Sequence, residues 1–365
     1  MTAATAGRER AAACLVGIAD ELERLGRAGY RVGAFHRAAE AVRALTEVEL
    51  VGRISAGTLA ELPGLGPVTA GVVAEAVTGE EPGYLVRLRE ERVPLEPAAR
   101  ELLEQLRGDC HTHSDWSDGN AGIEAMADRG RALGREYQVL TDHSPRLAIA
   151  RGLSAEQLAR QLDVVAAYNA ERGGDGFRLL SGIEVDILAD GSLDQTPELL
   201  DRLDVVVASV HSHLRAPAEV LTPRMLAAVA DPHTDVLGHC TGRVLRRDSG
   251  RTTVKTRPES TFDAAAVFAA CARHGVAVEI NSRPDRLDPP EPLLRLAAET
   301  GCLFAIDSDA HYPVQLDWLA FGCQRAARCG ITADRVVNTW PVARLLAWTG
   351  RQVRRSGGRR PRSPR

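Results

Sequence analysis

Residues 8–90 carry apolar side chains at the spacing of amphipathic helices. The stretch ERAAACLVGIADELERLG keeps this spacing throughout, and GYRVGAFHRAAEAVRAL repeats it after a glycine-containing turn. GTLAELPGLGPVTAGVVAEAVTG follows, in which LPGLGP (62–67) separates two short helices. The pattern therefore predicts a small all-α unit in the first part of the chain.

A different rhythm of apolar residues begins after residue 107. Helical stretches such as AEQLARQLDVVAAYNAE separate short apolar runs, and the two alternate at a spacing of about thirty residues, as in βα units with a parallel sheet. At least seven such units fit, which favours a closed α/β barrel over an open sheet. The clearest runs are 138–143, 179–187, 205–213, 235–240, 276–281 and 303–311.

These patterns divide the chain into four parts. We expect an all-α unit over 1–90, a charged, proline-containing linker over 91–107, the barrel over 108–348 and a disordered tail over 349–365. The last fifteen residues, RQVRRSGGRRPRSPR, hold seven arginines and no acid. Such a tail serves either solubility or attraction to phosphate polymers, and the sequence leaves both roles open.

Composition narrows the class of protein. The formal net charge is −4, so the whole chain is no polyelectrolyte, and Lys255 is the only lysine. Seven cysteines without a C-x-x-C pair argue against a disulfide framework or a zinc ribbon and fit a reducing compartment. Because no run of eighteen apolar residues occurs, we expect a soluble, cytoplasmic protein without a membrane partner.

Residues that can bind metals stand at the ends of the apolar runs. In a parallel barrel these ends meet at one mouth, so side chains far apart in sequence converge there. Residues two apart on a strand point to the same side, which makes HTH and DAH two-residue pairs directed into one cavity. The set comprises His111, His113, His143, Glu184, His211, His239, Asp309 and His311, with Asp118 shortly after the first pair.

Nine imidazole and carboxylate groups are too many for one ion. They predict two or three divalent ions, for which Mn, Zn and Fe are suited to this mixture of ligands. We expect Glu184 and Asp118 to bridge ions and to be essential for catalysis, because such clusters activate water for attack at phosphorus. His213 is a neighbour of this set, while Asp109 and Asp115 belong to its polar surroundings.

In this order, H-T-H…D, T-D-H, G-I-E-V-D, S-V-H-S, G-H-x-T-G-R and S-D-A-H resemble the PHP (polymerase and histidinol phosphatase) family. The resemblance covers roughly 108–348 and fills all nine of the family's metal-ligand positions. It implies a distorted seven-stranded βα barrel with a trinuclear Mn, Zn or Fe centre. GIEVDILADGSLD, DVVVASVHS and LGHCTGR look most like the PHP domain of bacterial family X DNA polymerases. Cys240 departs from that pattern, which usually has proline there.

GYRVGAFHRAA and ELPGLGPVTAGVVAEAV resemble the N-terminal helix-hairpin-helix domain of the same polymerases. Arg31 and Arg37 are then candidates for phosphate contacts, with Gly64 and Gly66 in the hairpin. These glycines permit a tight turn with exposed N–H groups at a helix start, where a phosphate can bind; a plain packing corner is the alternative. Val72 stands where lyase relatives place a Schiff-base lysine, so amine-based lyase chemistry is not expected.

The resemblance implies a metal-dependent phosphoesterase acting on DNA in repair. The implied activity is 3′-5′ exonuclease, with 3′-phosphatase or abasic-site endonuclease as further activities. Arg243 would neutralise phosphate oxygens, and Arg146 and Arg151 are weaker candidates. Only residues 91–107 lie between the two recognised units, too few for a polymerase core, so we expect no polymerisation; a polymerase or repair partner would be a separate protein. The alternatives are a small-molecule phosphatase of the histidinol-phosphatase type and a non-catalytic DNA-binding repair factor.

Overall fold

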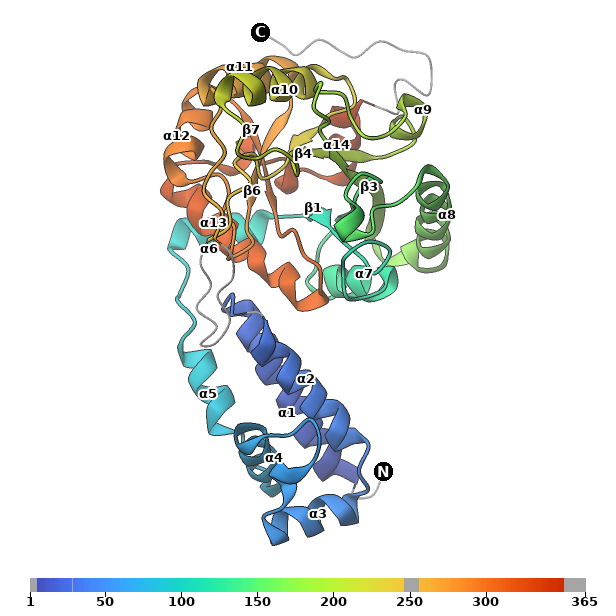
Figure 1. Cartoon of the computed structure of the whole chain (residues 1–365), viewed down its shortest axis with the longest axis vertical. Helices are drawn as coiled ribbons and strands as arrows, with labels where there is room; N and C mark the ends of the chain where they lie inside the picture. Colours follow the sequence, from blue (N-terminus) through green and yellow to red (C-terminus); the bar gives the residue numbers. More distant parts are fainter. Residues whose placement is uncertain (1–4, 28, 246–255, 351–365) are drawn as a thin grey trace. The chain divides into compact units, whose positions relative to one another are not determined.

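The computed structural model describes residues 5–27, 29–245 and 256–350, and it divides them into two compact units (Figure 1). One unit runs to Pro94, and the other begins at Leu95. Lys255 and residues 351–365, which include nearly all of the predicted tail, lie outside the described residues.

The first unit is all-α among its described residues. Its apolar residues face one another in a core of their own, which includes Leu15, Ile18 and Val42. Val72 is buried in this core, so this side chain has a packing role. The helices are α1 (Thr5–Arg24), α2 (Tyr30–Arg43), α3 (Glu47–Ala56), α4 (Pro67–Thr78) and α5 (Gly83–Glu90), with a 3₁₀ turn, η1 (Leu59–Glu61).

The second unit contains a seven-stranded parallel sheet whose strands follow in sequence order. A parallel bridge between Thr112 and Ala310 joins the end of the first strand to the segment after the last, which closes the barrel. The predicted α/β barrel is therefore confirmed. Its strands are β1 (Gly108–Thr112), β2 (Tyr137–Leu140), β3 (Arg178–Asp186), β4 (Val205–Ser209), β5 (Val236–Leu237), β6 (Ala277–Asn281) and β7 (Leu303–Asp307).

Helices surround the strands and bury the outward-facing side chains (Figure 1). Alternate residues of one strand serve the two faces: Ile183 and Val185 join the core under the helices, while Leu180 joins the core inside the barrel. The helices are α6 (Pro97–Gln105), α7 (Ile123–Ala132), α8 (Ala155–Arg172), α9 (Pro197–Leu200), α10 (Ala218–Ala230), α11 (Ala264–His274), α12 (Glu291–Glu299), α13 (Leu319–Arg328) and α14 (Val342–Thr349).

Strand β1 departs from this alternation. Its pairing with β2 is irregular between Asp109 and Thr112. Cys110 packs inside the barrel, yet the next side chain, His111, also points inward and contacts Glu279. Such an irregularity lets two consecutive residues face the same side, so the strand contributes both to the core and to the mouth of the barrel.

Helix α6 lies within 91–107, which the sequence pattern treats as a linker. Proline stands at its first position, where a missing N–H costs nothing, and Ala99 and Leu102 are buried against the barrel. The charged residues that suggest a linker occupy its exposed side. Most of the predicted linker is therefore an integral helix of the second unit.

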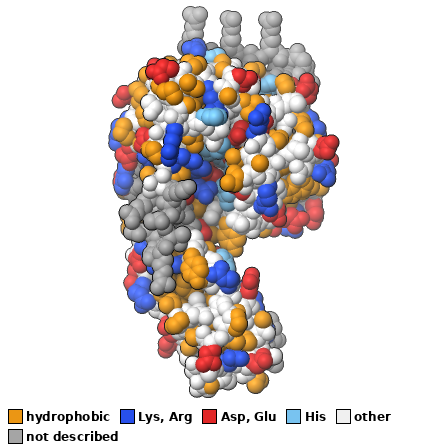
Figure 2. All heavy atoms as spheres, in the orientation of Figure 1, with side chains coloured by type: hydrophobic (Ala, Val, Ile, Leu, Met, Phe, Trp, Pro, Cys, Tyr) orange, Lys and Arg blue, Asp and Glu red, His pale blue; other side chains and the backbone are white. Residues whose placement is uncertain are grey.

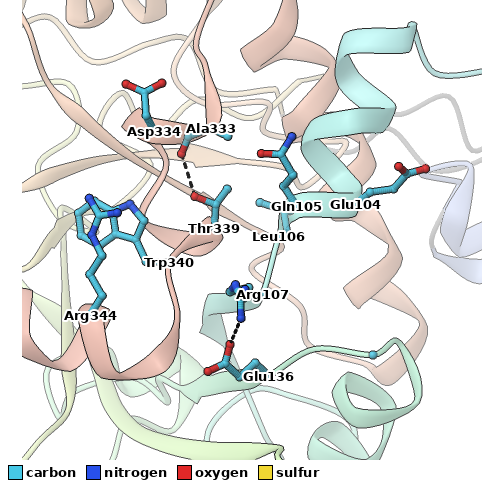
Figure 3. Close-up of a pocket in the computed structure, with 11 residues that line it drawn as sticks. Glu104, Gln105, Leu106, Arg107, Glu136, Ala333, Asp334, Thr339, Trp340 and Arg344 are labelled. Carbon is cyan, nitrogen blue, oxygen red and sulfur yellow. Dashed lines mark hydrogen bonds and ion pairs between the residues drawn. The ribbon is translucent and has the colours of Figure 1, made fainter.

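A cavity lies near the starts of β1 and β2, at the end of the barrel away from the strand ends that carry the predicted ligands (Figure 3). Arg107 and Glu136 form an ion pair there at 2.7 Å, and the Arg344 guanidinium lies 4.0 Å from the Trp340 ring centre. On the face seen in Figure 2, acidic and basic side chains are interspersed. None of the described helices is long and apolar enough to cross a membrane.

Candidate metal centre

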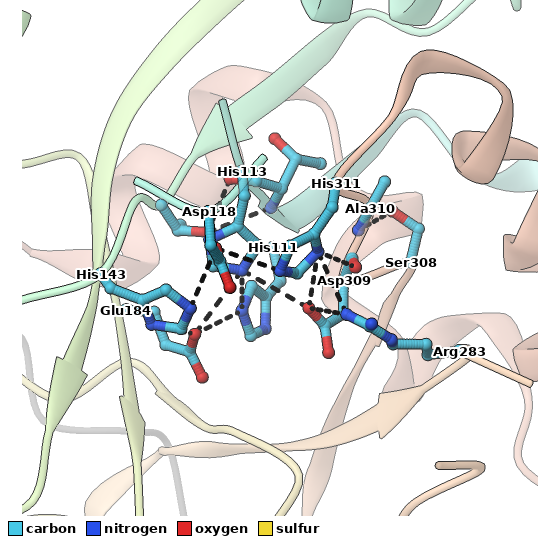
Figure 4. A network of polar contacts seen from close by, with 12 residues as sticks. His111, His113, Asp118, His143, Glu184, Arg283, Ser308, Asp309, Ala310 and His311 are labelled. Carbon is cyan, nitrogen blue, oxygen red and sulfur yellow. Dashed lines mark hydrogen bonds and ion pairs between the residues drawn. The ribbon is translucent and has the colours of Figure 1, made fainter. Parts of the chain in front are cut away.

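The structure brings all nine predicted ligand side chains together at the carboxyl ends of the strands. Figure 4 labels all of them except His211 and His239. Each comes from the end of a strand or from the segment directly after it, as expected for a parallel barrel. The group consists of His111 and His113 (β1 and beyond), Asp118, His143 (after β2), Glu184 (β3), His211 (after β4), His239 (after β5), and Asp309 and His311 (after β7).

The carboxylate of Glu184 is at the centre of this group. Five imidazoles surround it: two face its Oε1 and three face its Oε2. The nitrogen–oxygen distances are 2.8 Å for His239 and 3.2 Å for His211 at Oε1, and 2.9 Å for His143, 3.3 Å for His111 and 3.5 Å for His113 at Oε2. Each oxygen faces a different set of imidazoles. The carboxylate is therefore positioned as a bridging ligand would be.

Asp118 forms a second, smaller centre. Its Oδ1 lies 3.2 Å from Nε2 of His311 and 3.4 Å from Nε2 of His143. His143 therefore contacts Asp118 with one ring nitrogen and Glu184 with the other. Asp309 completes the group, with Oδ1 at 3.4 Å from Nε2 of His113.

Electrostatics within the group are dominated by the buried carboxylates. Burial lowers the pKa of His143, but Glu184 and Asp118 outweigh it and raise this pKa to about 10. Burial, reinforced by His311 and His143, lowers the pKa of His113 to about 3. The pKa of Glu184 lies well below its usual range despite burial, because the imidazoles of His111 and His143 favour its charge. The carboxylates therefore favour a positive charge on His143, whereas burial and the neighbouring imidazoles disfavour one on His113.

The donor set fits divalent metal ions. His113 Nδ1 is buried without a hydrogen-bond partner among the described residues, which is costly unless another ligand satisfies it. Glu184 Oε1 and His143 Nδ1 are also buried, and their close imidazole and carboxylate neighbours are not aligned as hydrogen bonds. The donor atoms form three groups, and within each group all atoms lie within 4.8 Å of one another. Any two groups have one residue in common. The groups are His113, Asp118, His143 and His311; His111, His113 and Glu184; and His143, Glu184 and His211.

Three residues that sequence reasoning missed hold the ligand candidates in place. Glu279 Oε1 lies 2.6 Å from Nδ1 of His111, and its other oxygen accepts the backbone N–H of His239. Asp186 bonds Nδ1 of His211, and the Asn281 amide donates to Asp309 at 3.1 Å. Such contacts fix the imidazole orientation and leave the remaining nitrogen available. Two features of the sequence could have indicated these residues. One is the charged residue in the middle of the apolar run VAVEIN, and the other is the acid two residues after Glu184.

Polar neighbours of the set differ in their surroundings. Asp109, expected among the polar surroundings, is buried and accepts hydrogen bonds from Ser308, and burial raises its pKa to about 6. Asp115 is exposed. Burial raises the pKa of the Cys240 thiol well above its usual range, and this side chain packs in the core rather than among the imidazoles. His213 is exposed.

The structure does not place Arg243, the candidate for phosphate contacts, in the lining of the cavity over the ligand group. Its guanidinium donates to backbone carbonyl groups, including that of Arg286 at 2.9 Å, and pairs with Glu259 at 3.2 Å. A cavity of about 400 Å³ lies over the ligand group, and the arginines that line it are Arg283 and Arg286. Both contact Asp309, at 3.5 and 3.3 Å. A loop sequence alone does not reveal which arginine turns toward the cavity.

Arg146 and Arg151, the weaker candidates for phosphate contacts, do not line this cavity; Leu147, Ile149 and Ala150 of the same segment do.

In the first unit, the four predicted DNA-contact residues line one cavity of about 690 Å³. Gly66 precedes helix α4, Gly64 has a positive φ of 91°, and both stand beside Arg31 and Arg37 of α2. A side chain at Gly64 would press on the Arg37 carbonyl at 3.4 Å. The exposed Tyr30 ring lies 5.5 Å from the Arg37 guanidinium. The first N–H groups of α4 have no acceptor within the helix.

Comparison with known proteins agrees with this geometry. The PHP domain model matches residues 109–283. This match covers a little under half of the chain. Members of this family are metal-dependent phosphoesterases, so the match supports the predicted class of enzyme, a hydrolase of phosphoester bonds.

Individual relatives differ in how much of them is matched. "DNA polymerase/3′-5′ exonuclease PolX" of Bacillus subtilis is 38% identical over 240 residues, which cover 65% of this chain and 40% of PolX. A "probable phosphatase" of Thermoanaerobacter sp. is 26% identical over 266 residues, covering 68% of this chain and 97% of that protein. Histidinol phosphate phosphatase of Lactococcus lactis, solved with zinc, L-histidinol and phosphate, has 18% identity and a TM-score of 0.42 and covers 62% and 92% of the two chains.

Exchange of Glu279 for glutamine tests how the ligand candidates are held. Glu279→Gln keeps the shape of the side chain but removes the charge that holds His111. We expect affinity for Mn or Zn to fall about 10- to 100-fold, as for other residues that support metal ligands. Competition with a chelator measures this, and the exposed Glu299→Gln is the matched control. Unchanged affinity in Glu279→Gln would show that Glu279 does not support the ligands.

Low pH should weaken metal binding. Because the pKa of His143 is raised to about 10, the metal-free protein carries a proton there at neutral pH, and a metal ion must displace it. We expect apparent affinity to rise with pH up to about pH 10, with proton release on binding. Calorimetry in buffers of different ionisation enthalpy measures the protons released; a heat independent of the buffer would contradict this expectation.

Proposed function

We propose that the protein is a metal-dependent phosphoesterase that acts on DNA, with 3′-5′ exonuclease as its main activity and 3′-phosphatase or abasic-site endonuclease activity beside it. The observation that carries the proposal is the arrangement of three donor groups, any two of which share one residue, and two of which contain Glu184. These groups hold seven of the nine side chains, and the other two, His239 and Asp309, contact Glu184 and His113. The arrangement supports the nine side chains as ligands of two or three Mn, Zn or Fe ions, with Glu184 and Asp118 bridging.

When bound, such ions lower the pKa of water and neutralise phosphate oxygens. The residues of the chain supply the remaining requirements. Arg283 and Arg286 present guanidinium groups in the same cavity and are suited to hold the non-reacting phosphate oxygens. Asp309 anchors both of these arginines, so one carboxylate orients the phosphate contacts and belongs to the ligand group. Glu279 and Asp186 keep their imidazoles in a fixed orientation during the reaction.

Two observations favour DNA as the substrate. PolX, whose name includes 3′-5′ exonuclease, matches the chain at 38% identity, although only 40% of PolX is covered. In the first unit, Arg31 and Arg37 lie beside a glycine turn that precedes helix α4. Backbone N–H groups at a helix start and nearby arginines bind phosphates without reading bases. We infer that this unit is a helix-hairpin-helix module for the DNA backbone.

A small-molecule phosphatase is the second candidate. The Thermoanaerobacter relative named a probable phosphatase is matched over 97% of its length, and that match does not require the helical unit. This candidate accounts for the barrel as well as the first does, but it gives the cavity beside α4 no role.

Hydrolysis assays separate the two candidates. We expect the protein with Mn to shorten 5′-labelled single-stranded and nicked DNA in steps and to act weakly on histidinol phosphate. Glu184→Gln should lose at least about 10³-fold in rate together with bound metal, because it removes the central ligand charge. Metal content and products are measured on the same preparations.

Phosphate release from histidinol phosphate alone would reject DNA as the substrate. Full metal occupancy in Glu184→Gln would reject the bridging role of this residue.

Exchange of Arg31 tests the role of the helical unit. We expect Arg31→Ala to weaken DNA binding about five- to tenfold and to reduce its salt dependence by about one phosphate contact. Fluorescence anisotropy with labelled DNA over a series of salt concentrations measures both. Arg43→Ala, at the other end of α2, is the control, and metal content should not change. Equal affinity in Arg31→Ala and the control would remove Arg31 from the DNA-binding surface.

A further inference from the structure

The cavity over the ligand group has walls of two kinds. Arg283 and Arg286, from the segment after β6, make one part of its lining cationic. Leu147, Ile149 and Ala150, from the segment after β2, make another part apolar. His143, which precedes the apolar segment, and Arg283 lie on opposite sides of the ligand cluster in Figure 4.

Ile149 is the most prominent residue of the apolar wall. Its side chain is 92% exposed, the largest value among the large hydrophobic residues that the structure describes. Single exposed apolar residues are common on protein surfaces. This one differs because it lines the cavity of a metal site together with two other apolar residues.

The segment that carries Ile149 has a fixed shape. The N–H of Leu153 donates to the His143 carbonyl at 2.8 Å, and that of Ala150 donates to Leu147 at 2.9 Å. A Cβ at Gly152 would lie 1.8 Å from the Ser144 carbonyl oxygen, so the segment folds back tightly on the strand end. The backbone conformation of this segment therefore keeps Ile149 exposed beside the ligand candidate His143.

We propose that Leu147 and Ile149 form a subsite for the nucleobase attached to the reacting phosphate. This inference rests on the proposed phosphoesterase function and specifies its substrate as a nucleotide with an unpaired base. A base presents an apolar face that packs on aliphatic side chains, and its phosphate would be held by the arginines of the same cavity. Esters of small polar alcohols lack such a face and gain nothing from this wall.

Binding of products tests the subsite without relying on catalysis of DNA. Thymidine 5′-monophosphate and inorganic phosphate are titrated into the Mn-loaded full chain by calorimetry. We expect the nucleotide to bind about tenfold more tightly than phosphate, and Ile149→Ala to remove most of this ratio while phosphate affinity stays unchanged. Ile149→Phe should increase the ratio, because an aromatic face stacks better on a base.

Val220→Ala is the matched control, since Val220 is 51% exposed on α10 and does not line this cavity. Ile149→Ala removes no buried contact, so folding should be unaffected, and circular dichroism checks this. A wild-type ratio in Ile149→Ala, or a lower ratio in Ile149→Phe, overturns the subsite; the apolar wall would then serve another occupant, such as a protein side chain.

Failure of the subsite differs from failure of the proposed function. If phosphate and nucleotide bind equally while the protein cleaves phosphoesters, the phosphoesterase function stands and the nucleobase subsite fails. If neither ligand binds the metal-loaded protein and no phosphoester is cleaved, the proposed function itself fails, and the subsite with it.

Discussion

One buried carboxylate, that of Glu184, constrains the architecture of the barrel. A carboxylate away from water is costly unless positive charge or hydrogen bonds compensate it. Here the compensation comes from five imidazoles on segments far apart in sequence. Strands β1, β2, β4 and β5 must therefore end where the histidines at or after their ends reach the same two oxygen atoms. This requirement couples strand register to the chemistry of the site.

The barrel and the position of the ligand group could be predicted from the sequence because the same rule applies to every strand. Parallel strands end at one mouth, so a metal-capable residue at the end of each apolar run identifies the site. The structure brings these nine side chains together, and the alternation of apolar runs with helical stretches predicted the barrel. Both inferences depend only on periodicity and on which end of a strand carries the polar residue.

What could not be predicted depends on local backbone detail. The irregularity in β1 breaks the two-residue alternation, so His111 points inward although Cys110 does too. Arg243 seemed a suitable phosphate contact, but the chain folds so that Arg283 and Arg286 reach the cavity. Charge and proline suggested a linker where α6 packs on the barrel, because only its buried side, with Ala99 and Leu102, is apolar enough to pack, and the charged residues are exposed.

The closure of the barrel has a consequence for synthesis of the protein. Strand β1 meets the segment after β7 through the ligand-bearing residues themselves: the His113 N–H donates to the Ala310 carbonyl at 2.8 Å, and the Asp309 N–H donates to His111 at 3.0 Å. Chains emerge from the ribosome from the N-terminus onward. The helical unit can thus fold early, whereas the metal centre cannot be complete until residue 311 has left the ribosome. A truncated chain would hold the helical unit but lack the complete group of ligand candidates.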